Sequence, residues 1–289
     1  YDSEVRRMDV KNHNMNKEKP IMRKRLKVIA FLAFFLGIVL AVSQYFGFVS
    51  KTVYEESVSH LTEVFYQSDN MLRELSNKNL TYLHMWSKYL QDAPSESKIR
   101  DYIDKAQKDA GFLYFYFLSA DGNYKMTTGE TGYLGLQENI EDEIQKGNDI
   151  ITNAAVPGKS QMLVFASPKA HGSYQGFKYD AIAIAYENAD IVNVLDISAF
   201  NGKAKSYVLH PDGRVVIDHS LESWGNVYNF FGILREHTDI SEKEILEISK
   251  KFKEGHTGAM LLNLDEKDYY LVYEKSGIQD WVFLGLVQA

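Results

Sequence analysis

The 289-residue sequence contains no cysteine. Disulfides, thiolate nucleophiles, cysteine-ligated zinc and iron–sulfur clusters are therefore excluded, and the fold must be held by its core alone. P-loop, dinucleotide-binding and Gly-x-Ser-x-Gly motifs are absent. None of the eight histidines pairs with another at metal-ligand spacing. We therefore expect no catalytic residue, no metal site and no cofactor in this region.

Acidic residues outnumber basic ones beyond the first 49 residues. Residues 1–49 carry nine Lys/Arg and four Asp/Glu, a net charge of +5, and the whole chain has −7, which leaves −12 for the remainder. An acidic surface argues against nucleic acid as a partner. We interpret the acidic run Glu141-Asp142-Glu143 as a solvated helix face rather than a metal site.

One long apolar run is present, at residues 28–49, with 22 uncharged residues. A helix rises about 1.5 Å per residue, so this run can cross a hydrocarbon core of roughly 30 Å. Four basic residues stand between positions 23 and 27, and no comparable cluster follows the run. Because basic residues stay on the cytoplasmic side, we predict a cytoplasmic tail over residues 1–27 and a membrane helix over 28–49, with the rest of the chain extracellular.

Two alternatives compete with a membrane anchor. A buried core helix can be equally apolar, but 22 uncharged residues is long for one, and the basic flank would then be unexplained. A cleaved signal peptide is also possible, because Ala41-Val42-Ser43 resembles a small-x-small cleavage site. The apolar run continues past that site through Val49, which favours an uncleaved anchor.

Residues 50–94 are predicted to form one long signalling helix that continues from the membrane helix. No proline or glycine occurs from Lys51 to Leu90. Apolar residues recur there at three- and four-residue steps, interrupted by Ser68 and Asn79. The residues of this stripe are Val58, Leu61, Phe65, Leu72, Leu75, Tyr82 and Trp86. A face of this kind can pack on a domain or pair with a second copy, so we expect a homodimer.

The remaining residues indicate two similar units, each opening with a hairpin. The turns are Asp121-Gly122 and Asp212-Gly213, and helices and further strands follow each of them. We expect a helix over residues 95–110, and loops over 129–137 and 168–176. An antiparallel sheet with helices on one side, used twice, accounts for this order and predicts an α+β fold.

At this point the sequence resembles the double Cache sensor domains of bacterial receptors. The segment from Ser206 to Val216, which surrounds Pro211-Asp212-Gly213, carries most of the resemblance. The closing strands at 269–273 and 280–287, and the link from 181–185 to 196–200, add to it. The resemblance covers roughly residues 50–289. It implies two tandem PAS-like sheets with flanking helices: a membrane-distal, ligand-binding subdomain at 95–200 and a membrane-proximal subdomain at 201–289.

The resemblance also implies a role. In such receptors the final strand leads into a second membrane helix and then a cytoplasmic output domain. We expect a diguanylate cyclase (GGDEF) domain or a histidine kinase as that output, so that this chain would be a truncated signal transduction receptor. The alternative is an exported, membrane-anchored binding or envelope protein with no signalling output.

The ligand is expected to be a small molecule bound in the distal subdomain, between the sheet and the long helix. Apolar walls with a few polar anchors are typical of such sites. The candidate lining residues are Trp86, Tyr114, Tyr116, Met126, Thr128, Phe165, Tyr179 and Asp180. Asp180 is expected to need a partner, which could be internal or a ligand amine. The Arg and Trp-Tyr motif of the amino-acid-binding subgroup is missing after the first hairpin, so the identity of the ligand stays open.

Overall fold

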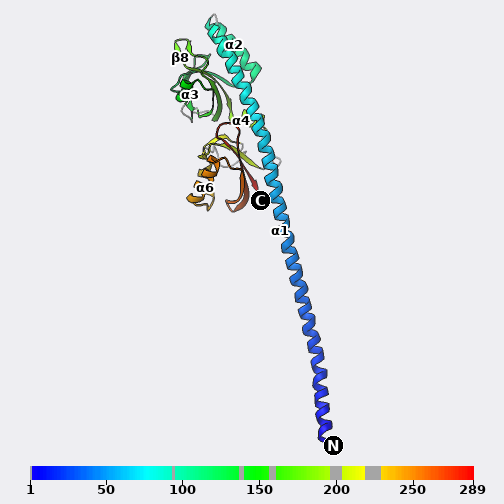
Figure 1. The fold of residues 1–289 in the computed structure, drawn as a ribbon. Helices are drawn as coiled ribbons and strands as arrows, with labels where there is room; N and C mark the ends of the chain where they lie inside the picture. The colour runs from blue at the N-terminus through cyan, green and yellow to red at the C-terminus, as the bar shows by residue number, and fades with distance from the viewer. Residues whose placement is uncertain (1, 93–94, 137–139, 156–160, 196–203, 219–228) are drawn as a thin grey trace. The chain divides into compact units, whose positions relative to one another are not determined.

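The computed structural model describes residues 2–92, 95–136, 140–155, 161–195, 204–218 and 229–289. They form two compact units, Tyr1–Glu56 and Ser57–Ala289, which are described separately. Helices and antiparallel sheets are both present, and the strands fall into two main sheets (Figure 1). The α+β class with two tandem sheets is therefore confirmed.

The first unit is helical and belongs to helix α1 (Asp2–Asp92). From Phe31 onward the helix contains an apolar window with a mean hydropathy of 2.0, and the described residues bury none of it. The side chains of Phe34 and Phe48 are 69% and 70% exposed. By length and composition this stretch could cross a membrane, but a signal sequence near the N-terminus would meet the same criteria. The anchor over residues 28–49 therefore remains a prediction.

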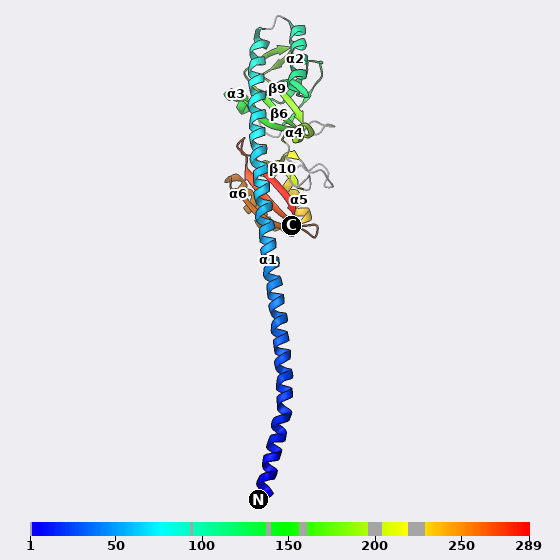
Figure 2. The same cartoon turned by 90° about the vertical axis from the view of Figure 1, so that its right-hand side faces the viewer.

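In the second unit α1 buries one face against both sheets (Figure 2). Leu61, Leu72 and Leu83 are fully buried on this face, and the Phe65 ring stacks on Phe283 with centroids 5.8 Å apart. The continuous helix predicted over residues 50–94 is confirmed as far as Asp92. Its buried stripe differs from the predicted one, because Val58, Leu75 and Tyr82 are only partly buried, whereas Leu61, Phe65, Leu72 and Trp86 are buried.

Polar side chains on the buried face of α1 connect it to the rest of the unit. Ser68 donates a hydrogen bond to the carbonyl of Leu195 (3.3 Å), and Asn79 accepts one from the Tyr186 hydroxyl (2.9 Å). The two polar interruptions of the predicted stripe are therefore both connections to the distal part of the unit. Asp69 and His84 make two further connections, to the Ser276–Gly277 turn and to Asp149.

Buried serines recur along the same face of α1, at Ser57, Ser68, Ser76 and Ser87. The hydroxyls of Ser76 and Ser87 donate to the carbonyls of Leu72 and Leu83, four residues earlier, both at 2.7 Å. These hydroxyls are satisfied within the helix itself and need no partner from the sheets.

The distal sheet has seven strands in the order β3-β2-β1-β9-β6-β5-β4. At its centre β1 pairs antiparallel with β9, which pairs antiparallel with β6. Its strands are β1 (Tyr114–Leu118), β2 (Asn123–Lys125), β3 (Thr131–Tyr133), β4 (Gly135–Leu136), β5 (Ile150–Ala155), β6 (Gln161–Ser167) and β9 (Ala181–Glu187). A small hairpin of β7 (Gly172–Tyr174) and β8 (Phe177–Tyr179) lies between β6 and β9 in the sequence.

Three helices accompany the distal sheet: α2 (Glu96–Ala110), α3 (Glu141–Lys146) and α4 (Asn188–Leu195). As predicted, α2 begins after Ser95 and ends at Gly111, which has a left-handed backbone (φ 77°). The Ser95 hydroxyl, however, makes no capping hydrogen bond and pairs with Ser97 instead.

The two predicted loops are wrong in part. Residues 129–137 contain β3 and β4, and residues 168–176 contain β7. These strands have two or three residues and include Gly132, Gly135 and Gly172. Strands this short cannot show the apolar alternation that identifies a strand in a sequence, and their glycines look like turn signals.

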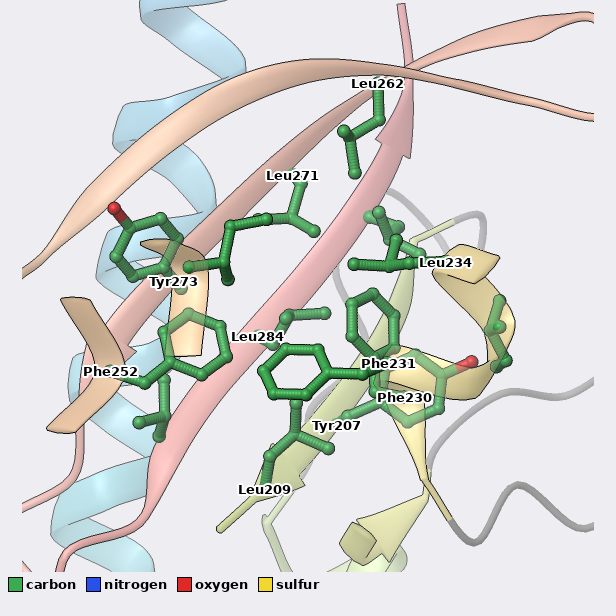
Figure 3. Close-up of a cluster of buried hydrophobic side chains, with 14 of the residues drawn as sticks. Tyr207, Leu209, Phe230, Phe231, Leu234, Phe252, Leu262, Leu271, Tyr273 and Leu284 are labelled. Carbon is green, nitrogen blue, oxygen red and sulfur yellow. The ribbon is translucent and has the colours of Figure 1, made fainter. Parts of the chain in front are cut away.

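The proximal sheet has five strands in the order β11-β10-β14-β13-β12. α1 contacts one face of it, and α5 and α6 contribute to a core on the other face (Figure 3). Ser241 and Glu244 form a capping box at the start of α6, as the Ser-x-x-Glu spacing of the sequence favours. The elements are β10 (Lys205–Leu209), β11 (Val215–Asp218), α5 (Phe230–His237), α6 (Glu242–Lys253), β12 (Gly258–Leu264), β13 (Lys267–Lys275) and β14 (Val282–Gln288).

α1 comes very close to the proximal sheet at Gly285 in β14. A Cβ atom at this position would lie 2.8 Å from Cζ of Phe65 and 3.0 Å from Cδ2 of Leu61. Both distances are shorter than ordinary van der Waals contact. A residue without a side chain is therefore required where the helix crosses this strand.

The buried His210 gives a prediction about pH. Burial lowers the pKa of His210, and Arg214 lowers it further, while Asp212 and Asp280 oppose the shift. The unfolded chain therefore binds a proton near pH 6.5 that the folded chain binds only at lower pH. We expect the neutral His210 side chain to make its full contribution to the free energy of unfolding above about pH 6.5. This contribution should be lost as the pH falls from there through the pKa of His210 in the folded chain.

Urea unfolding midpoints from about pH 7.5 down to about pH 5 would measure this loss. The midpoint should fall with pH in the natural chain and fall less steeply in His210→Gln, which has no titrating group at position 210. Carboxylates with lowered pKa, such as Asp121, affect stability only at lower pH. Equal slopes in the two proteins would contradict the prediction.

Candidate functional site

The eight predicted site residues do not line one pocket, because they lie on both faces of the distal sheet. Tyr116 faces the same side as its strand partner Ala183, whereas Phe165 is paired with Ile184. Successive residues of a strand point to opposite faces, so Tyr116 and Phe165 are on different sides. The prediction of a single wall between the sheet and the long helix is therefore wrong.

Three of the eight residues pack between the sheet and the helices. Trp86 of α1 contacts Phe115 at a ring distance of 6.0 Å, Phe165 is fully buried, and Tyr179 packs on Phe117 at 5.0 Å. Trp86 also borders a groove of about 370 Å³ between α1 and α2, together with Tyr82 and Tyr102. Most of this face is hydrophobic core.

Tyr114, Tyr116 and Met126 lie on the opposite face of the distal sheet, in or against a second buried cluster. The Tyr116 ring meets the Tyr124 ring edge-on at 4.7 Å, and burial raises the pKa of the Tyr116 hydroxyl. Tyr116 is therefore a neutral hydroxyl at physiological pH. The Tyr116 hydroxyl donates to the sulfur of Met162 at 4.0 Å.

The last two predicted residues, Thr128 and Asp180, are exposed. Thr128 belongs to the turn after β2. Asp180 lies between β8 and β9, and its Oδ2 accepts a hydrogen bond from the Ala120 backbone N–H at 2.8 Å. The partner that Asp180 was expected to need is thus internal, although a carboxylate can accept several hydrogen bonds. Its predicted place beside the sheet interior is wrong.

Asp180 borders an open concave surface of about 810 Å³ at the β1–β2 turn, which we call the hairpin hollow. The β1–β2 hairpin, β3, the start of α3 and β8 with its turn form its walls. It is lined by Ser119, Ala120, Asp121, Asn123, Tyr124, Thr131, Gly132, Glu141, Gly176, Phe177, Lys178 and Asp180.

The hairpin hollow has more negative than positive charge. Asp121, Glu141 and Asp180 supply three carboxylates, and Lys178 supplies one ammonium group. The Ser119 hydroxyl and the backbone of Asn123 lower the pKa of Asp121, which keeps that carboxylate ionised. Surfaces of this kind favour ligands that carry a positive charge and hydrogen-bond donors.

Burial raises the pKa of Tyr124, and nearby Glu130 adds to the shift. The Tyr124 hydroxyl therefore stays protonated and contacts Glu130 at 3.4 Å. Tyr124 therefore contributes an aromatic ring and a neutral hydroxyl to the lining of the hollow.

Sequence reasoning missed most of the hairpin hollow. Only Asp180 was among the candidates. Asp121 was read as a turn residue, and Glu141 as part of a solvated helix face. The sequence offered one usable signal, the Asp-Gly turn, but it gave no sign that α3 and β8 come to the same turn.

The comparisons with known proteins concern the fold. No protein-family model matches the sequence, and no curated protein matches it significantly. Among solved structures, the ligand-binding domain of the amino-acid chemoreceptor PctB of Pseudomonas aeruginosa PAO1, in complex with L-Arg, is similar. It has 14% sequence identity and a TM-score of 0.55, and the match covers 81% of this chain and 96% of that one.

Two further structures are similar to the same extent. Methyl-accepting chemotaxis protein X has 12% identity and a TM-score of 0.55, covering 83% of this chain and 99% of its own. The extracellular domain of mmHK1S-Z3, named as a histidine kinase, has 12% identity and a TM-score of 0.53, covering 83% and 94%. The chain therefore has the fold of the extracellular sensor domains of chemoreceptors and histidine kinases, as its resemblance to double Cache domains predicted.

Proposed function

We propose that this chain is the extracytoplasmic sensing region of a membrane-bound signal transduction receptor. The observation that carries the proposal is the fold, which is shared over more than four-fifths of the chain with extracellular sensor domains. The apolar run at 28–49 anchors it, and residues 1–27 are cytoplasmic. A ligand bound in the distal subdomain biases the arrangement of α1 against the last strands, and so reaches a cytoplasmic output domain.

The ligand site in this proposal is the hairpin hollow, and the ligand is a small molecule with an ammonium or guanidinium group. Its three carboxylates support this choice. The similar PctB domain is in complex with L-Arg, which is consistent with a cationic ligand here. L-Arginine and simple diamines are therefore the first probes.

Asp180→Asn tests this site. The amide oxygen of asparagine can still accept the hydrogen bond from Ala120, so the hairpin should keep its structure, while the negative charge is removed. We expect at least a tenfold loss of affinity for the cationic probe by calorimetry, with an unchanged melting temperature.

Asp142→Asn is the matched control, because Asp142 is an exposed carboxylate on α3 outside the lining of the hollow. It should leave binding unchanged. If Asp180→Asn bound the probe as tightly as the natural chain, the hollow would not be the ligand site.

The topology has its own test. A reporter that works only in the cytoplasm, fused after Ala289 in this chain, should be inactive. Activity there would contradict the proposed orientation.

The gene sequence beyond Ala289 distinguishes the receptor from the non-signalling alternative. The receptor requires an apolar run of about 20 residues there, followed by an output domain. Sedimentation of the chain in detergent tests the expected homodimer.

A further inference from the structure

The two sheets of the second unit meet at strand β11. Among the described residues it is the end strand of the proximal sheet, so one of its edges has no strand partner there. Backbone groups on such an edge need other hydrogen-bond partners when they are buried. Residues 215–217 of β11 are buried. Side chains from the distal subdomain supply partners for this strand.

Asn188, the first residue of α4, binds one end of β11. Its Nδ2 donates to the carbonyl of Asp218 at 2.6 Å, and its Oδ1 accepts from the backbone N–H of Asp218 at 2.9 Å. The amide thus makes the same pair of bonds with Asp218 that a neighbouring strand would make. α4 directly follows β9, the central strand of the distal sheet.

Asn153 of β5 binds the other end of β11. This side chain is completely buried, and its Nδ2 donates to the carbonyl of Val215 at 3.0 Å. Its Oδ1 lies 3.3 Å from Nε2 of His210, which is also buried and whose ring packs edge-on against Trp281. With neutral His210, Nε2–H donates to Asn153.

We propose that Asn153 and Asn188 complete the edge of β11 and join the distal and proximal sheets into one mechanical unit. β5 and α4 belong to the distal subdomain, so a displacement of either is passed to β11, and from β11 through β10 to β14. The connection between the two sheets does not depend on what the protein does. Its use in signalling rests on the proposed receptor function.

Distance measurements on the full chain in detergent test this joint. The natural sequence has no cysteine, so spin labels attach only at introduced ones. Gln145→Cys on α3 and Glu247→Cys on α6 are exposed positions, one beside each sheet. The distance distribution between the labels should be narrow. In Asn153→Leu/Asn188→Leu, which removes both amides, it should widen at least twofold.

Two variants keep this test decisive. Asn263→Leu is the matched control, because Asn263 bonds to Asp268 within the proximal sheet, and it should leave the distribution narrow. Asn188→Asp keeps the acceptor for the Asp218 N–H but loses the donor. This variant should widen the distribution by less than the double variant does. It carries the test if the double variant fails to fold.

A distribution of unchanged width in folded Asn188→Asp and in the folded double variant would overturn the proposal. The readout needs no ligand. A failure of the cationic probes to bind would therefore count against the proposed function and leave the joint standing.

Discussion

Gly285→Val is expected to lower the free energy of unfolding by about 3 kcal/mol, because a side chain at this point of β14 overlaps Phe65 and Leu61. Both contacts involve buried core side chains, which are 1% and 0% exposed. They have no room to move aside, so α1 must move away from the sheet or the neighbouring side chains must leave their rotamers. Chemical denaturation followed by circular dichroism measures the loss.

Gly232→Ala supplies the control for this prediction. Gly232 lies in α5, and a Cβ atom there would meet nothing within 4 Å. Alanine is favoured over glycine in helices by up to about 1 kcal/mol, so this variant should be unchanged or slightly more stable. A Gly285→Val chain as stable as the natural one would show that α1 is not seated on β14 as described.

Trp86→Ala is expected to cost about 3 to 5 kcal/mol of stability. The indole is 4% exposed and contacts Phe112, Phe115 and Tyr82 at ring distances of 5.3, 6.0 and 5.7 Å. Removing it leaves a cavity where α1 meets the distal sheet. Thermal and urea unfolding of the full chain in detergent would report the change.

Met85→Ala is the comparison, since the neighbouring Met85 side chain is 53% exposed and should cost little. The pair also decides how Trp86 is interpreted. If Trp86 lined a ligand-binding pocket and were not part of the core, Trp86→Ala would change the affinity for the ligand and leave the unfolding midpoint unchanged.

The order of elements could be predicted from the sequence, because long elements have a period. The 3.6-residue spacing of apolar residues on α1 and the capping box at Ser241 each have a local cause, and both are present. β3, β4 and β7 were missed because two or three residues are too few to show an apolar alternation. The helix boundary at Gly111 was found because a left-handed residue there favours glycine.

The candidate site was harder to predict, since it depends on which face a residue takes. Tyr116 and Phe165 are both aromatic strand residues, and only the register of β1, β9 and β6 separates them. A one-residue change of register would exchange their faces. Asp180 was singled out for its charge, but the groups that share the hollow with it come from four separate segments.

The serines of α1 bear on how easily that helix could slide. Hydroxyls that bond to their own helix, as those of Ser76 and Ser87 do, travel with it and resist no axial movement. Resistance comes from the packing of Leu61 and Phe65 against β14 and from the cross-connections at Ser68, Asp69, Asn79 and His84. Single substitutions at the four hydrogen-bonding positions are therefore expected to ease axial movement of α1 without changing any residue that lines the hairpin hollow.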